Sequence, residues 1–214
     1  MIAYLFILLI VLSAVVTIRT SHYGQKRYVY FFKPLTMLLI MLVALLEPAI
    51  SPSYKYLILA GLLFSLAGDV FLMLPSDRFV SGLIAFLIAH LLYIVAFAAK
   101  VDGLLYWPLI PLVILGGVVY TMIYPSLEEM KIAVLLYVLV ILTMAWLAWE
   151  WWAQTGQKDA LIAFFGAMLF VVSDVILAFN RFRGAVKYYS ALNLTTYFGA
   201  QCLLATSIGL SIWA

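Results

Sequence analysis

The sequence predicts an all-α fold: a polytopic membrane bundle of eight transmembrane helices, forming a single integral membrane domain over residues 1–214. The first reason is composition, because 68% of the residues are hydrophobic and only 10% are charged, against roughly 25% in soluble domains. The second is length, because apolar runs of about 20 residues, enough to cross ~30 Å of hydrocarbon as a helix, recur along the chain. The third is that polar segments, many with proline or glycine, separate these runs.

The first four helices are predicted over 2–18, 29–47, 55–75 and 79–99. No basic segment precedes the first apolar run, so we interpret it as a retained span and not as a cleaved signal peptide. A basic segment from Arg19 to Arg27 follows it. Prolines mark the next two boundaries, with Pro48 and Pro52 after the second helix and Pro75 after the third.

The last four helices are predicted over 104–123, 130–149, 159–180 and 188–212. Polar segments at 125–131, 154–159 and 181–187 separate them. Pro108, Pro111 and the pair Gly116–Gly117 predict that the fifth helix is kinked. Membrane helices tolerate such residues where neighbouring groups satisfy the freed backbone atoms.

The loops differ in charge, and this difference predicts the orientation. Of the twelve basic residues, nine fall on one side of the predicted membrane: Arg19, Lys26, Arg27, Lys33, Arg78, Lys131, Arg181, Arg183 and Lys187. Because cytoplasmic loops are enriched in Lys and Arg, that side is predicted to be cytoplasmic and both termini extracytoplasmic. The expected location is a bacterial inner (plasma) membrane, in which the protein is multi-pass.

Several kinds of site are disfavoured by what the sequence lacks. The single cysteine, Cys202, excludes an internal disulfide and a multi-cysteine metal site, and two histidines are too few for a histidine-rich zinc centre. No Gly-x-Ser-x-Gly segment occurs, so serine hydrolysis lacks its usual framework. We therefore expect no metal and no cofactor. The net charge of +3 reflects the cytoplasmic loops and does not indicate a nucleic-acid partner.

Two aspartates lie inside apolar segments with similar surroundings, Asp69 in LLFSLAGDVFLML and Asp174 in AMLFVVSDVILAF. An ionisable residue at membrane depth costs a few kcal/mol, so each is a candidate functional residue. Both lie about four residues past the middle of helices that are predicted to run in the same direction. At 1.5 Å per residue, both carboxylates are expected ~6 Å to the cytoplasmic side of the midplane. This match indicates a possible 4+4 internal repeat with a site between the halves.

Three polar residues of the second and fourth helices are candidates to accompany the aspartates. Lys33 either extends to the membrane interface or pairs with an aspartate and keeps it ionised. His90 is either a buried neutral histidine bonded to a neighbouring helix or an acid, base or orienting partner of Asp69. Tyr93 lies three residues after His90 and shares its helix face.

The eighth helix carries a polar stripe. Asn193, Tyr197 and Gln201 are spaced four apart, so they either bond to other helices or line a cavity shared with the aspartates. Ser173 precedes Asp174, and Asn180 at the end of the seventh helix is expected to border the same cavity. By contrast, Tyr137 is interpreted as a packing residue.

Five segments resemble a known family: GDVFLMLP, FLIAHLLYIVAF, FGAMLFVVSDVILAFNRF, TTYFGAQCLLA and the KPL opening of the second helix. In order and spacing they are similar to the YhhN-like family, which includes the lysoplasmalogenases. The resemblance implies an eight-span enzyme that uses water to hydrolyse the vinyl ether of a lysophospholipid, lysoplasmalogen. The products are a fatty aldehyde and glycerophosphoethanolamine or glycerophosphocholine. The motif positions are Lys33, Asp69, His90, Tyr93, Ser173, Asp174, Tyr197 and Gln201.

The implied reaction suits two carboxyl groups. A vinyl ether is cleaved by protonation at carbon, and water captures the resulting oxocarbenium ion. One carboxyl group then acts as the acid while the other stabilises the cation or activates water, as in a glycosidase. Asp69 and Asp174 are the predicted pair, without an assignment of the two roles. Arg78, Arg181 and Lys187 are expected to hold the phosphate.

Two other functions remain open at this point. A proton-coupled carrier of a small molecule or lipid also uses paired carboxylates near the midplane, but it needs access from both faces of the membrane. A non-catalytic lipid-binding protein would use the aspartates only to hold helices together. The physiological substrate, the headgroup preference and the oligomeric state are not determined by the sequence.

Overall fold

The computed structural model describes residues 2–49 and 51–209, with side chains from residue 5 onward. Within this part, all regular elements are helical. They are α1 (Ile2–His22), α2 (Lys26–Leu46), α3 (Pro52–Met73), α4 (Phe79–Ala98), α5 (Leu109–Ile123), η1 (Tyr124–Ser126), η2 (Glu128–Met130), α6 (Lys131–Thr155), α7 (Lys158–Phe182) and α8 (Tyr189–Thr206).

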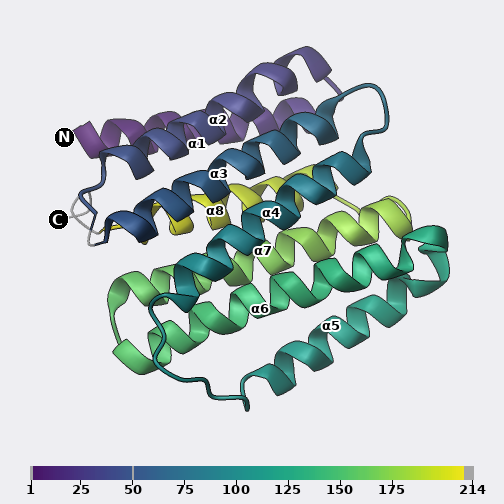
Figure 1. Ribbon diagram of the computed structural model, residues 1–214. Coiled ribbons are helices and arrows are strands. Elements are labelled where there is room, and N and C mark those ends of the chain that lie inside the picture. Colours follow the sequence, from purple (N-terminus) through teal and green to yellow (C-terminus); the bar gives the residue numbers. More distant parts are fainter. Residues whose placement is uncertain (1, 50, 210–214) are drawn as a thin grey trace.

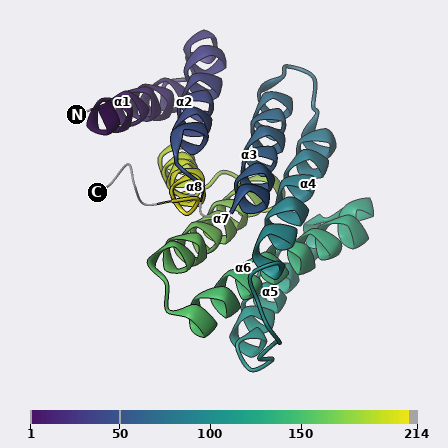
Figure 2. The same cartoon turned by 60° about the vertical axis from the view of Figure 1, so that its left-hand side comes forward.

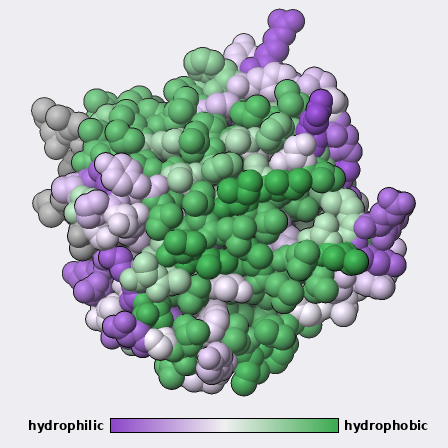
Figure 3. Space-filling view, viewed as in Figure 1, coloured by the Kyte–Doolittle hydropathy of each residue, from purple (hydrophilic) through white to green (hydrophobic). Residues whose placement is uncertain are grey.

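Seven of the helices in the described residues are long and apolar enough to cross a membrane, so the protein is a multi-pass integral membrane protein. Figure 3 shows a broad apolar surface on one face, with hydrophilic residues gathered toward its two ends. The helix outside this set is α8, which carries the polar stripe. Eight membrane spans, the internal repeat and the orientation of the termini therefore stay predictions.

The arrangement of the helices explains why α8 is polar. It packs against α1, α2, α3 and α7, and it lies toward the middle of the bundle while α5 lies at the edge (Figures 1 and 2). Surrounding helices can provide hydrogen-bond partners that lipid cannot. A helix in this place can therefore carry Asn193 and Gln201 without exposing them to hydrocarbon.

Most helix boundaries agree with the predictions, and the differences have local causes. α5 begins at Leu109 and not at residue 104, with Pro108 as its N-cap. Pro111 then lies in the first turn, where no helical partner is needed for the missing N–H, so both prolines fit the start of the helix. The kink that Pro108, Pro111 and Gly116–Gly117 predict stays a prediction. α6 continues past residue 149 to Thr155 and ends at Gly156, which adopts the left-handed conformation with φ 63°. α8 ends at Thr206, and residues 210–212 of the predicted span lie outside the described part.

Two glycines of α3 bring this helix close to α4. A Cβ atom at Gly61 would lie 2.2 Å from the ring of Tyr93, and one at Gly68 would lie 2.7 Å from the ring of Phe86. Small residues allow such close approach between membrane helices. The contact turns Asp69, the residue after Gly68, into the protein, where it is 1% exposed.

The turns from α1 to α2, α3 to α4 and α7 to α8 lie at the same end of the bundle, on the right in Figure 1. Lys26, Arg78 and Arg181 lie at this end. It is the end that the distribution of basic residues predicts to be cytoplasmic.

Candidate functional site

A cavity of about 570 Å³ opens at this end and contains both aspartates in its lining. Its rim includes Lys26 at the start of α2 and Asp77 and Arg78 from the α3–α4 turn, and its lining includes Asp69 from α3 and Asp174 from α7. The two similar sequence segments therefore reach one shared space. Tertiary packing brings the two segments together, because α3 and α7 are separated in the chain by three other helices.

Asp69 has a lysine and a tyrosine as partners. Lys33 Nζ lies 2.8 Å from Asp69 Oδ1, and the Tyr197 hydroxyl donates to Asp69 Oδ2 at 2.8 Å. The Lys33 ammonium also lies 5.8 Å from the centre of the Tyr197 ring, a cation–π distance. Of the two interpretations of Lys33, the structure supports the pair with an aspartate, because the lysine points inward from α2.

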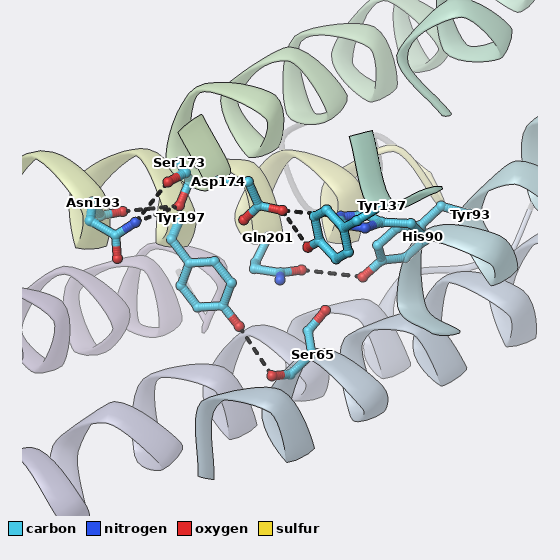
Figure 4. A network of polar contacts seen from close by, with 9 residues as sticks. All are labelled: Ser65, His90, Tyr93, Tyr137, Ser173, Asp174, Asn193, Tyr197 and Gln201. Carbon is cyan, nitrogen blue, oxygen red and sulfur yellow. Dashed lines mark hydrogen bonds and ion pairs between the residues drawn. The ribbon is translucent and has the colours of Figure 1, made fainter. Parts of the chain in front are cut away.

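Asp174 has different partners. The Tyr137 hydroxyl donates to Asp174 Oδ2 at 2.5 Å, and His90 Nε2 lies 3.9 Å from the same oxygen. Figure 4 shows Tyr137 and His90 on one side of the carboxyl group. No lysine or arginine forms an ion pair with Asp174 among the described residues. Asp174 is therefore a partly buried carboxyl group with a tyrosine hydroxyl as its hydrogen-bond donor and a histidine, not a lysine or arginine, as its nearest basic side chain.

Of the two interpretations of His90, a neutral histidine bonded to a neighbouring helix or a partner of Asp69, the structure shows neither. The histidine lies beside Asp174, and its ring nitrogens make no hydrogen bond within the described residues. α4 packs against both α3 and α6, and His90 is on the side of α4 that meets α6. Its ring lies 5.3 Å from that of Tyr137 and 4.6 Å from that of Phe170, measured between centroids. Although α4 forms a hairpin with α3, the sequence does not show whether a side chain of α4 faces α3 or another helix.

The polar stripe of α8 bonds to a different helix at each position. Tyr197 donates to Asp69 of α3, and Gln201 Oε1 accepts from the Tyr93 hydroxyl of α4 at 3.2 Å. Asn193 Nδ2 donates to Ser173 of α7, at 2.9 Å to its carbonyl oxygen and 3.1 Å to its hydroxyl (Figure 4). The stripe thus holds α8 in place. Asn193 and Tyr197 also line the cavity, whereas Gln201 is not among its lining residues.

Tyr137 is the main site neighbour that the sequence analysis missed. It is a single hydroxyl in an otherwise apolar segment of α6, and no spacing relates it to Asp174. Its ring is largely buried, and only the packing of α6 against α7 brings the hydroxyl to the carboxyl group. The sequence contains no signal that distinguishes this tyrosine from one that merely packs.

The rim differs in part from the expected phosphate site. Arg78 and Arg181 line the cavity, whereas Lys187 is not among its lining residues and lies 5.0 Å from the Tyr188 ring centre. Arg181 Nη2 donates to Asp77 Oδ2 at 2.7 Å and holds the pKa of Asp77 below its usual value. Lys26, which the sequence analysis did not select, takes a place at the rim.

Asn180 lies in the lining, as expected, but it also has a structural role. Its side-chain oxygen accepts the backbone N–H of Val186 at 3.2 Å. This bond ties the end of α7 to the turn that leads into α8, and so shapes the mouth of the cavity.

Some buried polar atoms near the cavity have no protein partner. Both ring nitrogens of His90 and Nε2 of Gln201 make no hydrogen bond within the described chain. Because buried polar groups in proteins are almost always hydrogen-bonded, such atoms are well suited to contact water or a bound molecule. The described residues contain no group of three or more His, Cys, Asp or Glu side chains that can hold a metal ion.

The helices thus enclose a polar cavity, open at one end, with one buried and one partly buried carboxyl group in unlike surroundings. This arrangement defines a class of protein: a multi-pass membrane protein with an internal site suited to acid–base chemistry. The sequence identifies the family within that class. The model of the YhhN family matches residues 28–208, and the chain belongs to this family.

Individual relatives agree with this assignment. The chain is 34% identical over 198 residues to the membrane protein YhhN of Escherichia coli O157:H7, which covers 92% of this chain and 95% of that protein. It is 37% identical over 162 residues to lysoplasmalogenase TMEM86A of Bos taurus, covering 70% of this chain and 64% of that protein. With lysoplasmalogenase TMEM86B of Homo sapiens it shares 35% identity over 162 residues, 73% of this chain and 66% of that protein. No solved structure matches the chain.

Proposed function

We propose that this protein is a lysoplasmalogenase-type ether hydrolase of a bacterial plasma membrane, in a bundle of eight membrane-spanning helices. It cleaves the vinyl ether of a lysophospholipid with water, giving a fatty aldehyde and a glycerophospho-base. The observation that carries the proposal is the pair of carboxyl groups on one cavity, Asp69 buried with a lysine and Asp174 partly buried without one. The relatives named lysoplasmalogenase support the class of substrate.

Asp174 acts as the proton donor in this scheme. Burying a lone charge is costly, so a carboxyl group without a cationic partner favours its neutral form, and the neutral form is the one that can give a proton. Tyr137 orients the group through its bond to Oδ2, and His90 lies close enough to assist through water.

Asp69 acts as the permanent carboxylate. The ion pair with Lys33 and the hydroxyl of Tyr197 keep it charged, and its negative charge stabilises the cation that forms during the reaction. Tyr93 and Gln201, and likewise Ser173 and Asn193, hold the helices that carry these groups at a fixed spacing.

Asp174 transfers its proton to the alkenyl carbon that is not bonded to oxygen, and the neighbouring carbon becomes an oxocarbenium ion. Water adds to that carbon and returns a proton to the Asp174 carboxylate, giving a hemiacetal. The hemiacetal then breaks its bond to the glycerol oxygen, which takes up the hydroxyl proton. The net reaction consumes one water and yields one aldehyde and one alcohol.

The headgroup lies toward the rim, where Lys26 and Arg78 provide positive charge for the phosphate. Arg181 contributes less, since Asp77 already neutralises it. The excess of basic residues at this end supports a cytoplasmic opening. All the turns that contribute to the rim belong to this end, which favours an enzyme over a carrier that opens to both faces.

The experiment that tests the proposal is aldehyde release from a lysoplasmenyl lipid by the purified protein. Asp69→Asn and Asp174→Asn are each expected to lose about 10²–10⁴-fold in activity, the usual contribution of acid–base catalysis. Asp102→Asn, an exposed aspartate of the α4–α5 loop, is the matched control and is expected to retain activity. Folded wild-type protein that releases no aldehyde from either headgroup class would exclude the proposed reaction.

Metal removal provides a separate test of the mechanism. Because the scheme uses only carboxyl groups and water, dialysis against a strong chelator is expected to leave aldehyde release unchanged. Loss of activity on chelation, with recovery on addition of zinc, would contradict it.

A further inference from the structure

A second, apolar pocket lies beside the polar cavity, between α4, α5, α6 and α7. Its lining is almost entirely aliphatic and aromatic and includes Leu83, Val119, Ile123, Val138 and Ala178. The two pockets share the residues Phe79, Asp174 and Leu177. Asp174 therefore stands at the junction of a polar and an apolar space, whereas Asp69 borders only the polar one.

Helix α5 forms the outer wall of this apolar pocket. Gly116, Val119 and Ile123 are buried against the bundle, while Ile110 and Val113 on the other side of the helix are more than half exposed. In a membrane those exposed side chains face lipid. Figure 2 shows α5 at the edge of the bundle, so a single helix separates the pocket from the bilayer.

We propose that this pocket binds the start of the hydrocarbon chain of the lysophospholipid substrate, and that the rest of the chain passes beside α5 into the bilayer. The proposal rests on the proposed function. A vinyl ether joins a polar headgroup to an apolar chain, so the group that protonates it must border both kinds of space. Of the two aspartates, only Asp174 does.

The size of the pocket limits how much of the chain it holds. Its volume is about 60 Å³, against about 570 Å³ for the polar cavity. Only the carbons nearest the ether therefore lie inside, and the remaining carbons stay in hydrocarbon. With the chain held in this way, the phosphate of the headgroup lies among the basic residues of the rim.

Blocking the pocket tests this assignment. Ala178 lies one turn after Asp174 on α7 and lines the apolar pocket but not the polar cavity. Ala178→Phe fills the space with a ring. The matched control is Val172→Phe, which adds a similar ring to the same helix at a residue that is 42% exposed and lines neither pocket.

The measurement is kcat/KM for aldehyde release from two glycerophosphocholine substrates, one with a two-carbon ethenyl ether and one with a sixteen-carbon alkenyl chain. For Ala178→Phe we expect a loss of at least tenfold on the long chain and less than twofold on the ethenyl ether. Val172→Phe is expected to change neither. An equal loss on both substrates, or no loss on either, would overturn the assignment.

A second measurement does not depend on turnover or on the variant. Wild-type protein is irradiated with a lysophosphatidylcholine that carries a diazirine on the third carbon of its chain, and the labelled peptides are identified. Labelling of α5 or of the stretch of α7 around Ala178 supports the assignment, and labelling elsewhere contradicts it. If the protein labels there but releases no aldehyde, the proposed reaction fails while the chain-binding pocket stands.

Discussion

The surroundings of Asp69 and Asp174 differ more than their sequences do. Each aspartate precedes a valine in an apolar segment, yet Asp69 pairs with Lys33 while Asp174 has Tyr137 and a histidine. The side chain of Asp69 is 2% exposed and that of Asp174 is 11% exposed. Similar local sequence therefore does not give similar electrostatics, because the partners come from other helices.

The largest expected difference between the two sites concerns stability. Asp69→Asn leaves the partly buried Lys33 ammonium without its carboxylate, and the cost approaches the value for breaking a buried pair, about 3–5 kcal/mol. Asp174→Asn removes no ion-pair partner of a lysine or arginine and is expected to cost about 1 kcal/mol. Thermal unfolding of both variants in detergent measures the difference. The double variant Lys33→Met with Asp69→Asn should regain most of the lost stability, and equal destabilisation by the two single variants would contradict the comparison.

A smaller effect is expected from the tyrosine hydroxyls, and it concerns activity. Tyr137→Phe removes the hydrogen bond that orients Asp174 and is expected to lower kcat about tenfold, with little change in KM, since a hydrogen bond of this kind contributes about 1.5 kcal/mol. Steady-state kinetics on the long-chain substrate provides the measurement. Tyr120→Phe is the control, because that hydroxyl bonds to the carbonyl of Lys131 away from the cavity. An unchanged kcat in Tyr137→Phe would show that the Tyr137 hydroxyl does not orient Asp174 for proton transfer.

The close approach of α3 and α4 is expected to stabilise the surroundings of Asp69 more than those of Asp174, because Asp69 lies on α3. Gly61→Ala forces the ring of Tyr93 to move and so disturbs its bond to Gln201, at an expected cost of about 1–3 kcal/mol. Gly117→Ala is the matched control, because nothing lies within 4 Å of a Cβ at that position. Unfolding temperatures of the two variants test this, and a similar value for both would show that α4 relaxes without cost.

The smallest expected effect lies at the rim. Arg181 lowers the pKa of Asp77, so this pair contributes stability above the usual pKa of an aspartate and loses it as the pH falls through the lowered value. Both side chains are largely exposed, so the contribution is small. Unfolding of wild-type protein and Asp77→Asn should therefore differ slightly at neutral pH and converge in acid. If the difference in stability between the two proteins instead grows as the pH falls, the pair does not stabilise the protein through the lowered pKa of Asp77.

Some of the site follows from sequence alone, because it depends on the identity of single residues. An aspartate in an apolar segment is costly wherever it lies, so Asp69 and Asp174 stand out without a structure. Polar residues four apart share a helix face, so the stripe on α8 is also visible. The membrane character and most helix boundaries follow from hydropathy and from prolines, glycines and charged turns.

Other features depend on contacts between helices that are distant in the chain. His90 meets Asp174 and not Asp69, Tyr137 joins the site, and Lys187 stays outside the cavity lining. Each outcome depends on how a helix is rotated about its axis and on which helix packs beside it, and neither quantity is encoded in a local pattern. The sequence by itself determined that this is a membrane helix protein with two costly carboxyl groups. Tertiary packing alone decided which of them pairs with the lysine and which borders the apolar pocket.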